Sequence, residues 1–200
     1  MSERFENLKK VPEQPAARLL AAGNAKLKTE LKSPASASVA AVLTELEAEE
    51  AWVDMIRLLS VALPSRECVW WACVAGREIL GEKGQSVCLD AAEKWVFEPN
   101  EENRAKVQER LELDSVGDKT APAATAALYA PGNLGPGEMA EHEAPPGIVA
   151  ACAFGVNLRT LKVADDPIAQ YQVIIDRALD IARGGNGTAE AELETEKGDA

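Results

Sequence analysis

Large apolar residues recur at helical spacing along much of this chain. The clearest example is the segment that ends at Pro64. Its apolar residues fall on one face and its polar residues on the other: Trp52, Ile56, Leu59 and Leu63 on the apolar face, and Asp54, Arg57 and Ser60 on the polar face. This spacing is typical of an amphipathic α-helix that buries one face, and a proline ends such a helix. We therefore predict a helix over residues 52–63.

The next predicted helix covers residues 65–80, with Ser65 as its N-cap, and it carries two apolar stripes. At about 100° of rotation per residue, the stripes lie on opposite sides: Val69, Ala72, Cys73, Gly76 and Leu80 on one, and Cys68, Trp71, Ala75 and Ile79 on the other. A helix with two such stripes is buried on two faces, so we predict that it is the central helix. Gly76 would let a neighbouring helix approach it closely.

The remaining arc of this helix holds charged residues together with one tryptophan: Arg66, Glu67, Trp70, Val74, Arg77 and Glu78. Neighbouring residues on a helix point in different directions, so one face cannot hide both Trp70 and Trp71. Because Trp70 alone shares an arc with charges, we expect it to be the partly exposed tryptophan.

Other segments show weaker helical signals. They include one or two short helices within residues 15–31, a helix opened by Ser33 and Pro34, a helix after Thr120, and helices over residues 86–97, 101–113, 148–164 and 166–183. Residues 131–147 are rich in proline and glycine and are expected to form one long loop. No run of alternating β-branched residues predicts a strand. The predicted fold is all-α, a single-domain bundle or array of about seven to nine helices without a sheet.

The length of 200 residues fits one domain with tails. Residues 1–14 are polar and interrupted by proline, which predicts a flexible N-terminal segment before a helical domain over residues 15–184. In residues 185–200 acidic side chains outnumber a single lysine and large apolar residues are almost absent. This composition predicts a disordered acidic tail.

Charge and hydropathy exclude several classes of partner. The net charge of −12 argues against nucleic acid, whose binding depends on lysine and arginine, and it would repel an anionic membrane surface. Residues 1–10 have no apolar segment typical of a secretory signal, so we expect the protein to be cytoplasmic. The longest apolar stretches are shorter than the roughly 20 residues of a membrane-spanning helix, so no membrane insertion is expected.

The residues that commonly carry catalysis are sparse. The cysteines form no C-x-x-C pair and lie in apolar contexts, which predicts buried reduced thiols: Cys68, Cys73, Cys88 and Cys152. A disulfide or zinc site is the alternative, but the single histidine, His142, supplies no recognisable ligand set. Nucleotide-binding and hydrolase motifs are absent. We therefore expect no catalytic residues, no metal, no cofactor and no enzymatic activity.

One segment is specific enough to compare with a known family. Residues 63–73 read LPSRECVWWAC, residues 91–96 read AAEKWV and residues 99–104 read PNEENR. With these motifs, the chain from about residue 40 to residue 184 resembles an uncharacterised bacterial all-helical family. That family is a domain of unknown function with a typical LPxREaVWWAC segment, often encoded near type VI secretion genes. The resemblance implies a genomic context and no catalytic residue.

Two functional hypotheses follow. In the first, the protein is a non-enzymatic accessory or adaptor protein that binds a secretion-system component through a face containing Arg66, Glu67, Trp70, Trp71 and Arg77. Tryptophan and arginine often dominate binding energy at interfaces. In the alternative, it is an acidic immunity-type inhibitor that masks a basic toxin. Both tryptophans could instead be core residues, with Arg66 and Glu67 completing a helix cap. A small-ligand pocket is a further possibility, but the sequence shows no convergent polar groups.

Overall fold

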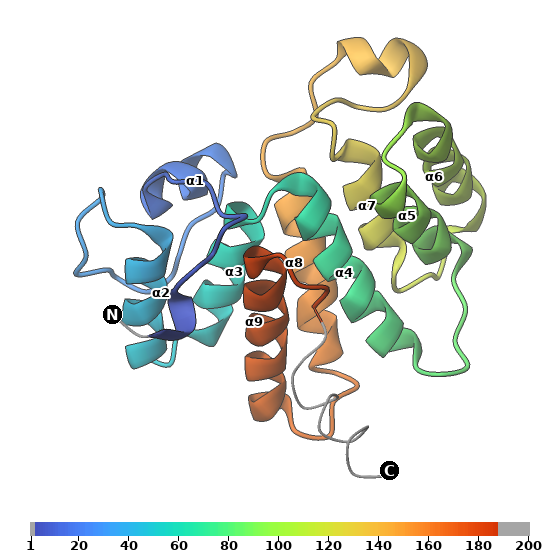
Figure 1. The fold of residues 1–200 in the computed structure, drawn as a ribbon. Coiled ribbons are helices and arrows are strands. Elements are labelled where there is room, and N and C mark those ends of the chain that lie inside the picture. Colours follow the sequence, from blue (N-terminus) through green and yellow to red (C-terminus); the bar gives the residue numbers. More distant parts are fainter. Residues whose placement is uncertain (1–2, 188–200) are drawn as a thin grey trace.

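The computed structural model describes residues 3–187, and this part of the chain is all-helical (Figure 1). Its nine α-helices are α1 (Ala16–Ala22), α2 (Val39–Ala48), α3 (Trp52–Ala62), α4 (Ser65–Leu80), α5 (Val87–Phe97), α6 (Glu101–Asp114), α7 (Ala121–Tyr129), α8 (Ile148–Thr160) and α9 (Pro167–Arg183). Two short 3-10 helices are η1 (Glu3–Phe5) and η2 (Gly137–Glu141). No strand occurs in residues 3–187, so the predicted all-α fold is confirmed.

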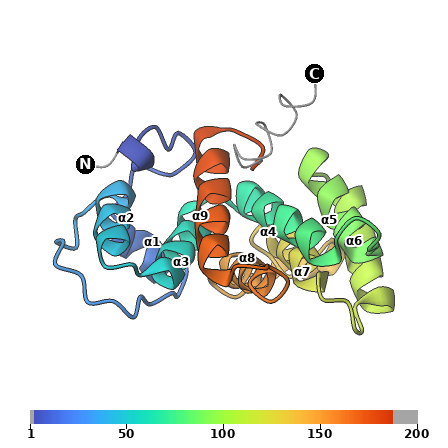
Figure 2. The same ribbon diagram turned by 90° about the horizontal axis from the view of Figure 1, so that it is seen from below.

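Helices α4 and α8 connect the two ends of the molecule. Figure 2 shows α1, α2 and α3 at one end, α5 and α6 at the other, and α4, α8 and α9 between them. Helix α4 packs against α5, α7, α8 and α9, whereas α8 packs against α3, α4 and α7. The central position predicted for α4 is therefore confirmed.

Both apolar stripes of α4 contribute to the core. Val69 and Cys73 from one stripe and Trp71 from the other have no exposed surface. A β-carbon added to Gly76 would lie 2.8 Å from Leu89 Cδ1 of α5, closer than such contacts allow. Gly76 thus permits the close approach of α5, as its position in the sequence predicts.

Two helices begin differently from the prediction. The helix expected at Ser33 and Pro34 starts at Val39, where Ser38 Oγ accepts a hydrogen bond of 3.2 Å from the Ala41 N–H. Ser33 lies in the loop that precedes the helix, where its backbone N–H donates to the Glu45 carboxylate at 3.0 Å.

The N-cap predicted at Ser65 is also wrong. Ser65 is the first residue of α4, and the first helical carbonyl belongs to Pro64, which accepts from the Cys68 N–H at 2.8 Å. Helix α7 begins directly after Thr120, as predicted, but the Thr120 hydroxyl donates to Asp118 Oδ1 at 2.7 Å and makes no cap bond to α7. Pro64 therefore takes the N-cap position of α4, and Asp118 accepts the hydrogen bond of the Thr120 hydroxyl.

Helix α1 ends at Ala22, so only one short helix forms in the segment where one or two were expected. The chain after it is held as an irregular loop against α3. Asp54 Oδ2 accepts hydrogen bonds from the backbone N–H groups of Lys28 and Thr29, at 2.8 and 2.7 Å. These bonds occupy donors that a continued helix would use internally.

The N-terminal segment, predicted to be flexible, makes specific contacts within its described part. Phe5 is buried, and the Arg4 guanidinium pairs with Glu47 of α2 and with Asp176 of α9, the latter at 2.6 Å. The Lys10 N–H donates to the Ala182 carbonyl at 2.8 Å. Residues 188–200, which hold most of the predicted acidic tail, lie outside the described residues.

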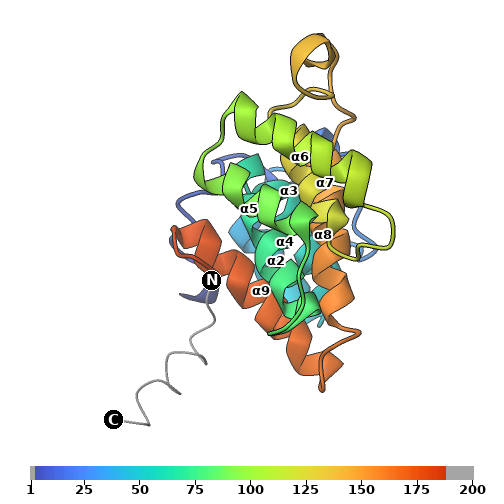
Figure 3. The ribbon, with the colours of Figure 1, turned by 90° about the vertical axis from the view of Figure 1, so that its right-hand side faces the viewer.

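The loop over residues 131–147 contains η2 and projects from one end of the molecule (Figure 3). The base of the loop is held by Arg104, which is 1% exposed although it belongs to the mostly polar helix α6. Arg104 Nε donates to the Leu128 carbonyl at 2.8 Å, and Arg104 Nη2 donates to the Asn133 carbonyl at 3.1 Å. One buried guanidinium therefore connects α6, the end of α7 and the loop.

Candidate protein-interaction surface

The adjacent tryptophans of α4 lie in different environments. Trp71 is 0% exposed, and its indole N–H donates to the Ile174 carbonyl of α9 at 3.2 Å. Trp70 is partly exposed, as expected from its charged arc. Trp71 is therefore removed from the predicted set of partner-binding residues, because a fully buried indole cannot contact a partner.

Trp70 packs against Phe97, the last residue of α5. The two ring centroids lie 5.4 Å apart with an interplanar angle of 64°, which is the edge-to-face arrangement that aromatic pairs prefer. Phe97 is 65% exposed, an unusual position for a large aromatic side chain. The sequence reasoning missed Phe97, although it lies about 100° around the helix from the buried Val96 and so falls off the apolar stripe.

Charged residues border this aromatic pair. Arg66 is exposed, and its Nε donates to the Val96 carbonyl at 2.6 Å, which ties the start of α4 to the end of α5. Lys10 Nζ and Glu67 Oε1 form an ion pair at 3.0 Å. A hollow of about 300 Å³ lies among these residues. We call the set the Trp70–Phe97 surface: Lys10, Arg66, Glu67, Trp70 and Phe97.

The segment that follows α9 covers one edge of Trp70. The Trp70 indole N–H donates to the Asn186 carbonyl at 2.7 Å. The Gly187 N–H donates to Asp180 Oδ2 at 2.8 Å, so the segment is held back against α9. Gly184 caps the helix with a φ of 104°, a conformation that favours glycine, and this confirms the predicted stop.

Arg77, also predicted to bind a partner, makes intramolecular ion pairs instead. Its guanidinium lies 2.7 Å from Asp90 Oδ1, and its Nε donates to Glu93 Oε1 at 2.7 Å. The hydrogen bonds that Arg77 donates to Glu93 and, to a lesser degree, to Asp90 raise the pKa of Arg77. Arg77 thus joins α4 to α5. The structure brings Arg66, Glu67 and Trp70 together at one hollow and places Arg77 at a separate hollow that Trp70 also lines.

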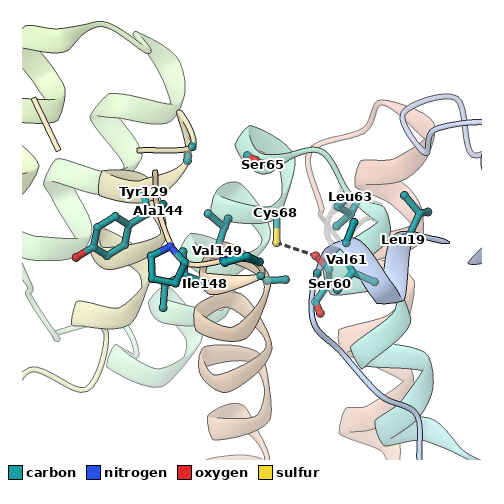
Figure 4. Close-up of a pocket in the computed structure, with 18 residues that line it drawn as sticks. Leu19, Ser60, Val61, Leu63, Ser65, Cys68, Tyr129, Ala144, Ile148 and Val149 are labelled. Carbon is teal, nitrogen blue, oxygen red and sulfur yellow. Dashed lines mark hydrogen bonds between the residues drawn. The ribbon is translucent and has the colours of Figure 1, made fainter. Parts of the chain in front are cut away.

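A third hollow, of about 270 Å³, lies between α3, α4 and the start of α8 (Figure 4). Its labelled side chains are mainly apolar, including Leu63, Ile148 and Val149. The Cys68 thiol donates to the Ser60 carbonyl at 3.3 Å, and burial raises its pKa to about 12. The thiol is therefore protonated at neutral pH, and this hollow offers no activated nucleophile.

The described part of the chain offers neither a metal-binding cluster nor a membrane-spanning helix. Within residues 3–187, no group of three or more His, Cys, Asp or Glu side chains is placed to hold a metal ion. His142 is exposed in the 131–147 loop. In the same residues no helix has the length and apolarity needed to cross a membrane.

The fold and the Trp70–Phe97 surface define an all-helical protein with an exposed aromatic pair beside charged residues. Residues 42–182 match the model of DUF6931, a family of unknown function. The match covers more than half of the chain, and the protein belongs to this family. It includes Arg66, Glu67, Trp70 and Phe97, whereas Lys10 lies outside it. No curated protein and no solved structure was found to be similar.

Proposed function

We propose that this protein is a non-enzymatic accessory or adaptor protein that binds another protein through the Trp70–Phe97 surface. The observation that carries the proposal is the exposure of Phe97 against Trp70, with the exposed Arg66 beside them. Aromatic residues and arginine are enriched among the residues that dominate binding energy. Burial of apolar surface contributes about 25 cal/mol per Å², so a partner that covers Phe97 gains affinity.

The surface is also held in one conformation before any partner binds. Arg66 is fixed to the Val96 carbonyl, Lys10 to Glu67, and the Trp70 indole to the Asn186 carbonyl. Preorganised side chains lose less conformational entropy on binding, which favours affinity. This preorganisation supports a docking role for the surface.

The proposed partner is a component of a type VI secretion system in the bacterial cytoplasm. This part of the proposal is supported by the resemblance of residues 63–73 to a motif often encoded near such genes. The net charge of −12 further disfavours nucleic acid as the partner.

Affinity capture from native cell extract, followed by mass spectrometry, tests the proposal. The tagged protein is compared with Phe97→Ala and with a matched control, Leu113→Ala, which removes a similarly exposed apolar side chain from α6. We expect a secretion component to be retained at high salt by the protein and the control and to be lost by Phe97→Ala. Equal retention by all three would contradict the proposal.

The net charge supports a second candidate, the immunity-type inhibitor of a basic toxin. Long-range electrostatic attraction weakens as salt screens it, whereas docking on an aromatic patch persists. In the same experiment, the inhibitor hypothesis predicts a basic partner that is released by salt and retained equally by Phe97→Ala.

A further inference from the structure

We propose that the C-terminal tail of this chain, residues 188–200, docks onto the Trp70–Phe97 surface and competes there with the partner. The docking itself rests on the geometry and charge of the surface, and only the competition rests on the proposed function. Three independent features support the tail as the occupant: where the described chain ends, the charge of the surface, and the pattern of the tail sequence.

The described chain ends beside the surface. Asn186 accepts the hydrogen bond of the Trp70 indole, and Gly185 and Asn186 line the hollow between Trp70 and Phe97. Thirteen residues follow Gly187. At about 3.3 Å per extended residue, they reach roughly 40 Å, which is ample for a site that adjoins their starting point.

The charge of the surface complements the tail. Arg66 is exposed and makes no ion pair with any residue in 3–187, and Lys10 adds a second cation that is shared with Glu67. The tail carries five carboxylates against Lys197: Glu190, Glu192, Glu194, Glu196 and Asp199. An acidic segment that starts beside an exposed arginine gains an ion pair by placing a carboxylate against its guanidinium.

The tail also contains one large apolar residue. Leu193 lies between Glu192 and Glu194, six residues beyond Gly187. The hollow offers it apolar contacts with Phe97 and with Ile181 of α9. Leu193 placed in the hollow would position its flanking carboxylates near Arg66 and Lys10, so one short sequence matches both the apolar and the charged parts of the surface.

Because the tail is tethered, its effective concentration at the surface is high, of order millimolar for a short flexible connection. A weak interaction is therefore enough to occupy the surface in the free protein. A partner with a similar pattern, an apolar residue flanked by acids, would have to displace the tail. Since the ion pairs are exposed, tail docking weakens as ionic strength rises.

NMR spectroscopy of the ¹⁵N-labelled full chain tests this inference without any partner. The indole resonance of Trp70 is assigned by its loss in Trp70→Phe. The full chain is compared with Leu193→Ser and with Glu192→Gln/Glu194→Gln, and Ala191→Ser serves as the control within the tail. We expect the resonances of the Trp70 indole N–H and the Phe97 backbone amide to shift in both test variants and to move the same way when salt is added to the unaltered chain.

Two results would overturn the proposal. One is a Trp70 resonance that is unchanged in Leu193→Ser and in the charge-neutralised variant. The other is a shift that depends on protein concentration, which would assign the occupant to a second copy of the chain. Neither result bears on the capture experiment, so failure of the tail proposal and failure of the proposed function are distinguishable.

Discussion

At the residue scale, Trp70 and Trp71 show how a single step along a helix separates two roles. The rotation of about 100° places Trp71 in the core against α9 and leaves Trp70 at the surface against Phe97. The environments differ because Trp71 belongs to one of the two apolar stripes of α4, whereas Trp70 lies on the remaining, charged arc. The two side chains are therefore expected to respond differently to truncation.

Trp71→Ala should lower the free energy of unfolding by about 3–5 kcal/mol, because it leaves a large cavity in the core. Phe97→Ala should change the same quantity by less than about 0.5 kcal/mol, since the ring is mostly exposed. Urea denaturation of both variants measures the difference. Similar losses in the two variants would show that Phe97 is a structural residue and would remove the basis for the proposed surface.

Arg104 is the clearest case of a residue whose role depends on tertiary structure. Its position in a polar helix predicts a solvated side chain, yet it is buried and donates to carbonyls from two later segments. Arg104→Met should cost about 3 kcal/mol of stability, because it leaves these buried carbonyls without a donor. It should also speed amide hydrogen exchange in residues 131–147. Arg110→Met, which removes an exposed ion pair of the same helix, is the control and should cost less than about 1 kcal/mol.

At the element scale, hydrophobic periodicity predicted where most helices lie, but local hydrogen bonds decided how several of them begin. The spacing of apolar residues placed α3, α4, α5 and α9 because it reflects burial of a face, which is a property of the helix itself. The caps expected at Ser33 and Ser65 are instead Ser38 and Pro64, and the Ser33 N–H is bonded to Glu45, a tertiary contact that the local sequence does not reveal. Phe97 could have been identified from its position off the stripe of α5, but its contact with Trp70 could not.

The turn between α6 and α7 supplies a prediction on pH dependence. Burial alone would raise the pKa of Asp118, but hydrogen bonds from Ser86 and Thr120 outweigh it and lower the pKa below the ordinary value. A lowered pKa in the folded state means that Asp118 contributes stability above the ordinary aspartate pKa, and that this contribution is lost as pH falls through the folded-state value.

Asp118→Asn should therefore reduce the loss of stability between neutral pH and acid, compared with the unaltered protein. Urea denaturation at a series of pH values measures this. Asp114→Asn, at the end of α6, is a control, because Asp114 lies in an exposed ion pair. An unchanged acid dependence in Asp118→Asn would mean that its hydrogen bonds do not stabilise the carboxylate.

At the scale of the whole molecule, α4 links the fold to the proposed function. Its two buried faces join the ends of the molecule, and its third arc presents Arg66, Glu67 and Trp70 beside the last residue of α5. Although the protein carries a net charge of −12, Arg66 and Lys10 place two cations at this site, and this local charge favours an acidic segment there. Membership of DUF6931, a family of unknown function, leaves the partner to experiment.

The most direct test of the central claim is the affinity of the captured partner, measured by isothermal titration calorimetry at low and high salt. We expect Phe97→Ala to weaken binding by at least about tenfold at both salt concentrations, as for an interface residue that contributes about 1.4 kcal/mol or more. Leu113→Ala should bind with unchanged affinity. A Phe97→Ala affinity equal to that of the unaltered protein would contradict the assignment of the Trp70–Phe97 surface as the docking site.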